Sequence, residues 1–128
     1  MHDKSQFFKK HPKFGFAVYL DLMKRRLARG EVYEIVFWGL CDHAQEHAKE
    51  LIEEFEAHQE SDTELKYTFL EILAQGQVRE AFPVFRNSLN SPDARLRCWA
   101  ELALKKLDTK EARRVLFEHD RESPSKKN

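Results

Sequence analysis

Apolar residues recur every three or four positions along most of this 128-residue chain, and such spacing predicts amphipathic α-helices. The first predicted helix carries Phe16, Leu20, Met23 and Leu27 on one face, and Gly30 is expected to be its C-cap. No segment shows the sustained alternation of apolar and polar residues that is typical of a half-buried strand. The pattern therefore predicts an all-α protein.

Six further helices are predicted after residue 30, each with its own apolar stripe. Residues that cap or break helices separate them, among them Asp62, Gly76, Asn90–Asp93 and Thr109. Pro83 fits only in the first turn of its helix, because proline has no backbone N–H to donate. The residues expected to face inward are Val32, Ile35, Val36, Phe37, Trp38, Leu40, Ala48, Leu51, Ile52, Phe55, Leu65, Phe69, Ile72, Leu73, Val78, Phe82, Phe85, Leu89, Leu96, Ala100, Ala103, Leu104, Leu107, Ala112, Val115 and Leu116.

The chain partly repeats itself at an interval of 31 residues. Short helices joined by tight loops suggest two-helix units, which must stack because one unit alone cannot bury its apolar face. We expect Asp93 to cap its helix and Arg97 to reach a carboxylate of a neighbouring unit, with Asp62 and Lys66 repeating that arrangement. The aligned positions are Asp93, Leu96, Arg97, Ala100 and Leu104, which match Asp62, Leu65, Lys66, Phe69 and Leu73.

The stretch from Pro83 to Leu104 resembles a HEAT repeat. It has a proline in the first helix, Asp93 in the turn, and the aliphatic–arginine pair Leu96-Arg97 followed by the small residue Ala100 in the second helix. The match is closest over residues 78–107, looser over 44–74 and weakest before 44. Because the usual HEAT unit has roughly 40–47 residues, the chain is more similar to the compact HEAT-like repeats of bilin-lyase-type and other bacterial scaffold proteins.

This resemblance implies a short right-handed α-solenoid of about three antiparallel helix pairs plus a terminal helix. One HEAT-like domain would span residues 1–122, and residues 123–128 would form a flexible C-terminal tail. In such solenoids the second helix of each pair lines the inner curve. The resemblance therefore also implies an inner face on which a partner can bind.

Composition favours a soluble, folded protein, since 41% of the residues are hydrophobic and 34% are charged. No apolar run approaches the roughly 18 residues that span a membrane, and the N-terminal segment has charges where a signal peptide would have an apolar run. We therefore expect a cytoplasmic protein that does not enter membranes. Cys41 and Cys98 lie in apolar helical patterns, which favours buried free thiols over a disulfide.

Charge is distributed unevenly although the net charge is zero. Residues 1–30 carry eight Lys and Arg against two acids, a balance of +6; residues 31–64 carry one against eleven, a balance of −10; and residues 65–128 carry thirteen against nine, a balance of +4. Such zones can steer a partner, or they can attract neighbouring helices to one another. The sequence leaves both interpretations open.

The segment from His43 to His47 fits the H-x-x-E-H motif of inverted zincins, in which two histidines bind zinc and Glu46 would act as the base. The motif is short, the chain has six histidines, and no residue stands out as a third ligand. Gly-rich phosphate loops and G-x-S-x-G are missing from the sequence. We expect no enzyme activity and no cofactor, and His43, Glu46 and His47 are only a weak candidate for a metal site.

A basic N-terminal third supports a second hypothesis, which is nucleic-acid binding. Aromatic residues alternate there with cations, as in proteins that bind single strands. The acidic helices that follow would repel phosphate at close range. The cations concerned are Lys9, Lys10, Lys13, Lys24, Arg25, Arg26 and Arg29.

The leading hypothesis is a non-enzymatic protein-interaction module, such as an adaptor, a regulator or an immunity-type protein. Trp99 and Tyr67 lie on the second helices of their pairs, where each would be either an exposed binding anchor or a packing residue between repeats. The acidic central zone would suit a basic protein partner. The residues expected to share this binding surface are Trp99, Tyr67, Lys66, Arg97, Glu71 and Glu101.

Overall fold

The computed structural model describes residues 14–59 and 63–122. These ranges contain seven α-helices, one short 3-10 helix and no strand, so the prediction of an all-α protein is confirmed for them. The tail over residues 123–128 lies outside the described part, as does Asp62. The elements are α2 (Phe16–Lys24), α3 (Gly30–Asp42), α4 (Ala48–Ala57), α5 (Thr63–Gln75), η1 (Arg79–Ala81), α6 (Phe82–Ser88), α7 (Ala94–Leu107) and α8 (Lys110–Glu122).

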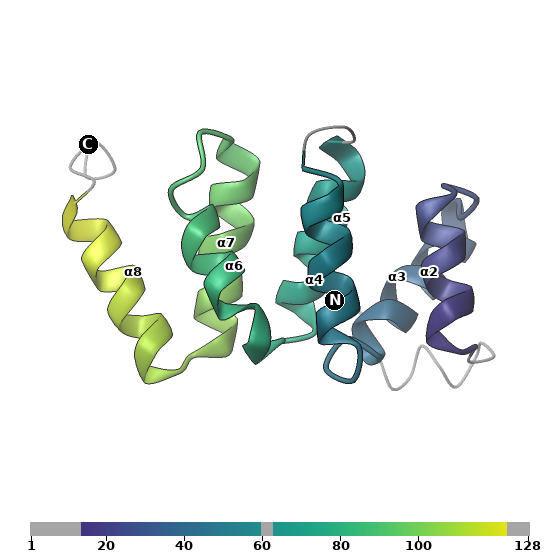
Figure 1. Cartoon of the computed structure of the whole chain (residues 1–128), viewed down its shortest axis with the longest axis horizontal. Coiled ribbons are helices and arrows are strands. Elements are labelled where there is room, and N and C mark those ends of the chain that lie inside the picture. The colour runs from purple at the N-terminus through teal and green to yellow at the C-terminus, as the bar shows by residue number, and fades with distance from the viewer. Residues whose placement is uncertain (1–13, 60–62, 123–128) are drawn as a thin grey trace.

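The helices follow one another in chain order along the longest axis of the molecule, from α2 and α3 at one end to α8 at the other (Figure 1). Consecutive helices pack as pairs: α2 with α3, α4 with α5, and α6 with α7. The second helices of the pairs are also in contact, α3 with α5 and α5 with α7, while α8 packs on α7. Helix α5 therefore has neighbours on both sides.

The core is continuous and is densest around α5. The four α5 residues expected to face inward are all buried, and Leu70 and Ala74, which were not predicted, are buried as well. Each fully buried leucine, isoleucine or phenylalanine contributes about 1.5–3 kcal/mol relative to an exposed one. The central helix thus carries much of the stabilisation that holds the neighbouring pairs together.

Several predicted caps and breaks are confirmed. Gly76 lies directly after α5 and donates its N–H to the carbonyl of Ile72. Pro83 lies in the first turn of α6, where no intrahelical donor is needed. At the start of α8, the hydroxyl oxygen of Thr109 accepts the N–H of Ala112 at 3.1 Å.

The prediction for the first helix end is wrong. Helix α2 ends at Lys24, Arg26 adopts a left-handed φ of 56°, and Gly30 is the first residue of α3 with a φ of 55°. The apolar spacing continues through Leu27 although the helix has already ended, so Leu27 is 53% exposed. Val32, expected to be buried, lies in the first turn of α3 and is also exposed.

Two glycines allow neighbouring helices to approach closely. A Cβ on Gly39 would lie 2.4 Å from the buried ring of Tyr19, where α2 packs on α3. A Cβ on Gly76 would lie 2.5 Å from the Cβ of Ala44, in the turn after α3. At both positions the absence of a side chain lets another part of the chain fill that space.

The two cysteines differ in burial. Cys41 is buried as expected, whereas Cys98 is exposed, and neither forms a disulfide. The prediction for Cys98 failed because its apolar neighbours Leu96 and Ala100 lie two positions away on α7 and face the core from a different side of the helix. None of the described helices is long and apolar enough to cross a lipid bilayer.

Candidate functional site

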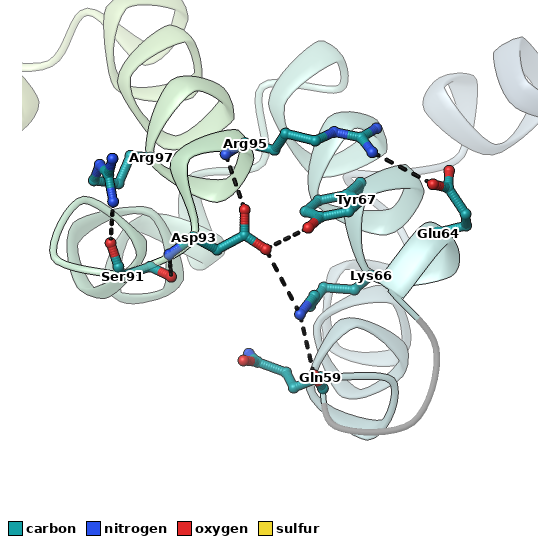
Figure 2. A network of polar contacts seen from close by, with 8 residues as sticks. All are labelled: Gln59, Glu64, Lys66, Tyr67, Ser91, Asp93, Arg95 and Arg97. Atoms are coloured by element: carbon teal, nitrogen blue, oxygen red, sulfur yellow. Dashed lines mark hydrogen bonds and ion pairs between the residues drawn. The ribbon is translucent and has the colours of Figure 1, made fainter.

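Asp93 begins α7 and is held by its own turn. Its N–H donates to the hydroxyl oxygen of Ser91 at 3.0 Å, and its Oδ1 accepts the N–H of Arg95 at 2.9 Å (Figure 2). An aspartate in this position satisfies a helix N–H that has no intrahelical acceptor. The predicted capping role of Asp93 is therefore confirmed.

The second carboxylate oxygen of Asp93 points across to α5 (Figure 2). Its Oδ2 accepts the hydroxyl proton of Tyr67 and lies 3.9 Å from Nζ of Lys66. Lys66 is only 8% exposed, and its Nζ also donates to the main-chain oxygen of Gln59 at 3.1 Å. A largely buried ammonium needs such partners, and these contacts join α5 and α7 to Gln59 in the turn after α4.

The ring of Tyr67 is covered from the α7 side. The guanidinium carbon of Arg95 lies 3.8 Å from the ring centroid, in the range of a cation–π contact. The same guanidinium lies 3.4 Å from Oε1 of Glu64, on the first turn of α5. Tyr67 therefore takes part in the packing between helix pairs through both its hydroxyl and its ring.

The hydrogen bond between Tyr67 and Asp93 shifts the pKa of both groups. Donation from the Tyr67 hydroxyl lowers the pKa of Asp93, and the backbone N–H groups of Arg95 and Leu96 lower it further. The same bond raises the pKa of Tyr67, because its proton is held by the carboxylate. Asp93 is thus ionised and Tyr67 protonated at neutral pH.

The prediction that Arg97 reaches a carboxylate of a neighbouring unit is wrong. Its guanidinium donates to the carbonyl oxygen of Ser91 at 2.8 Å, within its own turn, and it stays exposed. Lys66, not Arg97, reaches the carboxylate of a neighbouring pair. In the turn that follows α7, Oδ1 of Asp108 lies 2.9 Å from Nη1 of Arg113, so this aspartate pairs with α8.

The other predicted binding residues lie along the second helices. Trp99 is partly buried and packs against the core, and Glu101 lies 3.2 Å from Lys105 on the same helix. Burial raises the pKa of Glu71, and the positive charge of Arg95 offsets part of this rise. These residues come from α5 and α7.

Four further side chains belong to this surface and were not singled out as binding residues in the sequence: Tyr33, Thr68, Arg95 and Leu102. Tyr33 on α3 is 36% exposed. Its pKa is raised, because burial outweighs the opposite effect of a hydrogen bond with Thr68. Leu102 is also 36% exposed and lies one helical turn beyond Trp99. Their helical spacing was visible in the sequence, but their exposure depends on which neighbours cover them. We call the following set the second-helix row: Tyr33, Thr68, Glu71, Arg95, Trp99 and Leu102.

The basic residues of the nucleic-acid hypothesis are partly engaged within the chain. Nζ of Lys24 lies 3.1 Å from Oε2 of Glu54, and Arg25 lies 3.3 Å from Asp21. Arg26 and Arg29 are exposed between α2 and α3. The remaining three cations lie outside the described residues: Lys9, Lys10 and Lys13.

The described residues do not support the weak candidate for a zinc site. Residues 43–47 form a turn between α3 and α4, so they lack the continuous helix that this motif requires. The ring of His47 stacks on Phe16 at 3.9 Å, and its Nδ1 lies 3.1 Å from Glu50. Over residues 14–59 and 63–122, no three His, Cys, Asp or Glu side chains are placed to hold a metal ion.

The contacts of the second helices thus give a polar network centred on Asp93 and, beside it, the partly exposed second-helix row. Both are built from α5 and α7, and α3 adds Tyr33. Comparison with known proteins found no matching family model, no similar curated protein and no similar solved structure.

Proposed function

We propose that this chain is a compact HEAT-like repeat domain, a short right-handed solenoid, that binds a protein partner through the second-helix row and has no catalytic role. The observation that carries the proposal is a row of partly exposed aromatic and aliphatic side chains, Tyr33, Trp99 and Leu102, on the second helices of their pairs. Aromatic anchors of this kind dominate the binding energy of many protein interfaces.

Contacts between equivalent positions support the repeat assignment. Gln45 donates to the carbonyl of Gly76, and Arg95 pairs with Glu64; in both contacts the partners are 31 residues apart. This separation equals the interval at which the sequence repeats. Stacked units of equal length bring equivalent positions together in this way.

The polar network supports binding by fixing the row. Asp93 is bound by Tyr67 and Arg95 and lies near Lys66, so α5 and α7 are held in one relative position. A surface that is already ordered loses less conformational entropy when a partner binds. Tyr67, Lys66 and Arg97 then act as supporting residues, while Trp99 and Leu102 make the contacts.

Charge adds a preference for the partner. Residues 31–64 have a balance of −10 and include nearly all of α3 and the whole of α4. A field of this sign accelerates encounter with a basic protein and slows encounter with nucleic acid. We therefore infer a basic protein partner, encountered in the cytoplasm.

The experiment compares proteins captured from the source lysate by the wild-type chain and by two lysine variants. Leu102→Lys places a charge in the row, and Phe117→Lys makes the same kind of change on α8, where Phe117 is 63% exposed. We expect Leu102→Lys to weaken capture by about tenfold or more and Phe117→Lys to leave it unchanged. Equal capture by all three folded proteins would contradict the proposal.

Nucleic-acid binding is tested separately. A salt titration with random single- and double-stranded oligonucleotides would show a steep loss of affinity if the cations contact phosphates. Because the neighbouring residues 31–64 carry a balance of −10 and repel phosphate at close range, we expect no binding even at low salt. Tight, salt-sensitive binding would replace the protein-partner proposal with the nucleic-acid one.

A further inference from the structure

A groove lies beside α4, away from the second-helix row. It has a volume of about 560 Å³ and is bounded by the turn before α4, by one side of α4 and by η1. Gln45 fixes one wall, because its side-chain amide donates to the carbonyl of Gly76 at 3.2 Å. The lining residues are Gln45, Glu46, Ala48, Lys49, Glu50, Ile52, Glu53 and Glu80.

The groove combines apolar and acidic side chains. Ala48 is buried, and Ile52 is partly buried against the core, so both belong to its apolar part. Four glutamates and one lysine give the lining a charge of −3. Glu50 is held in place by His47, which in turn stacks on Phe16. The groove therefore suits an aliphatic side chain flanked by cations.

A segment with this chemistry is present in the same chain. Residues 25–29, which we call the basic loop, join α2 to α3 and contain three arginines and no acid. Between the arginines, Leu27 is 53% exposed, so the described residues cover only part of it. Arg25, Arg26 and Arg29 are also exposed. The basic loop thus presents an aliphatic side chain surrounded by positive charge.

We propose that the basic loop of one copy docks in the acidic groove of a second copy, with Leu27 against Ile52 and the arginines facing the glutamates. The charge complementarity of the two surfaces supports this occupant over an unrelated apolar segment. The net charge of the chain is zero, so two copies do not repel each other at long range. The second-helix row takes no part in this contact, so the inference does not depend on the row being a binding surface.

Arg25, at the start of the basic loop, can change partners at small cost. The pair between Arg25 and Asp21 is exposed on both sides, and exposed ion pairs contribute little to the stability of a fold. Charges at the edge of the groove are screened by salt, with a Debye length of about 10 Å at 0.1 M. Self-association should therefore be strongest at low ionic strength.

Sedimentation velocity of the full chain over a concentration series, at about 0.02 M and about 0.3 M salt, measures this association. We expect wild-type chain to self-associate at low salt and to dissociate at high salt. Glu53→Lys combined with Glu80→Lys should weaken association about tenfold or more, and so should Arg25→Glu combined with Arg29→Glu. Mixing these two folded variants restores an opposite-charge pair and should recover association that neither shows alone.

Glu118→Lys combined with Glu122→Lys on α8 is the matched control, because it changes the net charge as much as the groove variant does. It should leave association within about twofold of wild type. A wild-type chain that stays monomeric at low salt would overturn the proposal, and so would association that neither the groove nor the loop variant changes. A monomeric chain whose groove binds a polylysine peptide would instead assign the groove to a basic partner.

Discussion

The two contacts that α5 makes with its neighbouring second helices are built in different ways. Towards α7, the helices are joined by a polar network in which Asp93, Tyr67, Lys66 and Arg95 bind one another. Towards the N-terminal pair, a glycine allows close packing: Gly76, after α5, lies against Ala44, after α3. Polar pairing therefore supplements the apolar packing at one junction, and close approach at a glycine supplements it at the other.

Because of this difference, the two junctions should respond differently to pH and to substitution. A charged network depends on pH, and removing one member leaves the others with unmet hydrogen bonds. A close contact at glycine hardly depends on pH but tolerates no added atoms. Close packing at a glycine occurs again within the N-terminal pair, where Gly39 faces the ring of Tyr19.

The largest expected effect is that of Gly39→Val. Its side chain would meet the buried Tyr19 ring, and we expect a loss of about 3 kcal/mol in the free energy of unfolding. Urea denaturation followed by circular dichroism measures it. Gly15→Val is the control, since a Cβ there has nothing within 4 Å; it should cost less than about 1 kcal/mol. Similar losses for both variants would mean that the close packing at Gly39 is unimportant.

Asp93→Ala should come next, with a loss of about 2 kcal/mol. The variant removes the helix cap and leaves Lys66 and Tyr67 without the carboxylate. Asp93→Asn keeps an oxygen for the cap and should lose less in the same urea experiment. If the asparagine variant is as stable as wild type, the contact of the carboxylate with α5 adds nothing to the cap.

The polar junction should also make stability depend on pH. Because the folded pKa of Asp93 is lowered, its contribution is complete above the unfolded value of about 3.9 and is lost as pH falls through the folded pKa. Glu71 has the opposite sign, since its folded pKa is raised and its protonation in acid favours the fold. Thermal denaturation between about pH 6 and about pH 2 should show a shallower acid loss for Asp93→Asn than for wild type. Parallel curves would contradict this assignment.

Arg97→Ala should have the smallest effect, at most about 0.5 kcal/mol in the free energy of unfolding. Arg97 is exposed and donates to the Ser91 carbonyl of its own turn. Lys66→Ala, which removes a largely buried partner of Asp93, is the comparison and should cost more. An equal or larger loss for Arg97→Ala would place it in the junction after all.

Sequence patterns predicted the helices well where the core is continuous. The spacing of Leu65, Phe69, Ile72 and Leu73 located α5, and the turn around Asp93 located the start of α7. The repeat interval also identified Asp93 and Lys66 as structural, but it could not tell which cation reaches which carboxylate. Which cation reaches which carboxylate depends on how far neighbouring helix pairs are displaced from one another. The spacing of residues along one helix carries no information about that displacement.

The surface was harder to predict than the core. Apolar periodicity assigned Leu27 to a helix and Cys98 to the interior, and both side chains are exposed. The helical spacing of Tyr33 and Leu102 does not distinguish them from buried residues, and only the packing of α3, α5 and α7 shows that part of each stays uncovered. Periodicity indicates where a helix carries apolar residues, but the neighbouring helices decide how much of that stripe is buried.

The unequal burial of the two cysteines offers a practical route to the row. A maleimide fluorophore should react with Cys98 and spare Cys41, which the core shields from solvent. The dye would then sit next in sequence to Trp99, at the middle of α7. Its emission would report on any molecule that approaches this surface, whatever the chemistry of that molecule, and no engineered residue is needed.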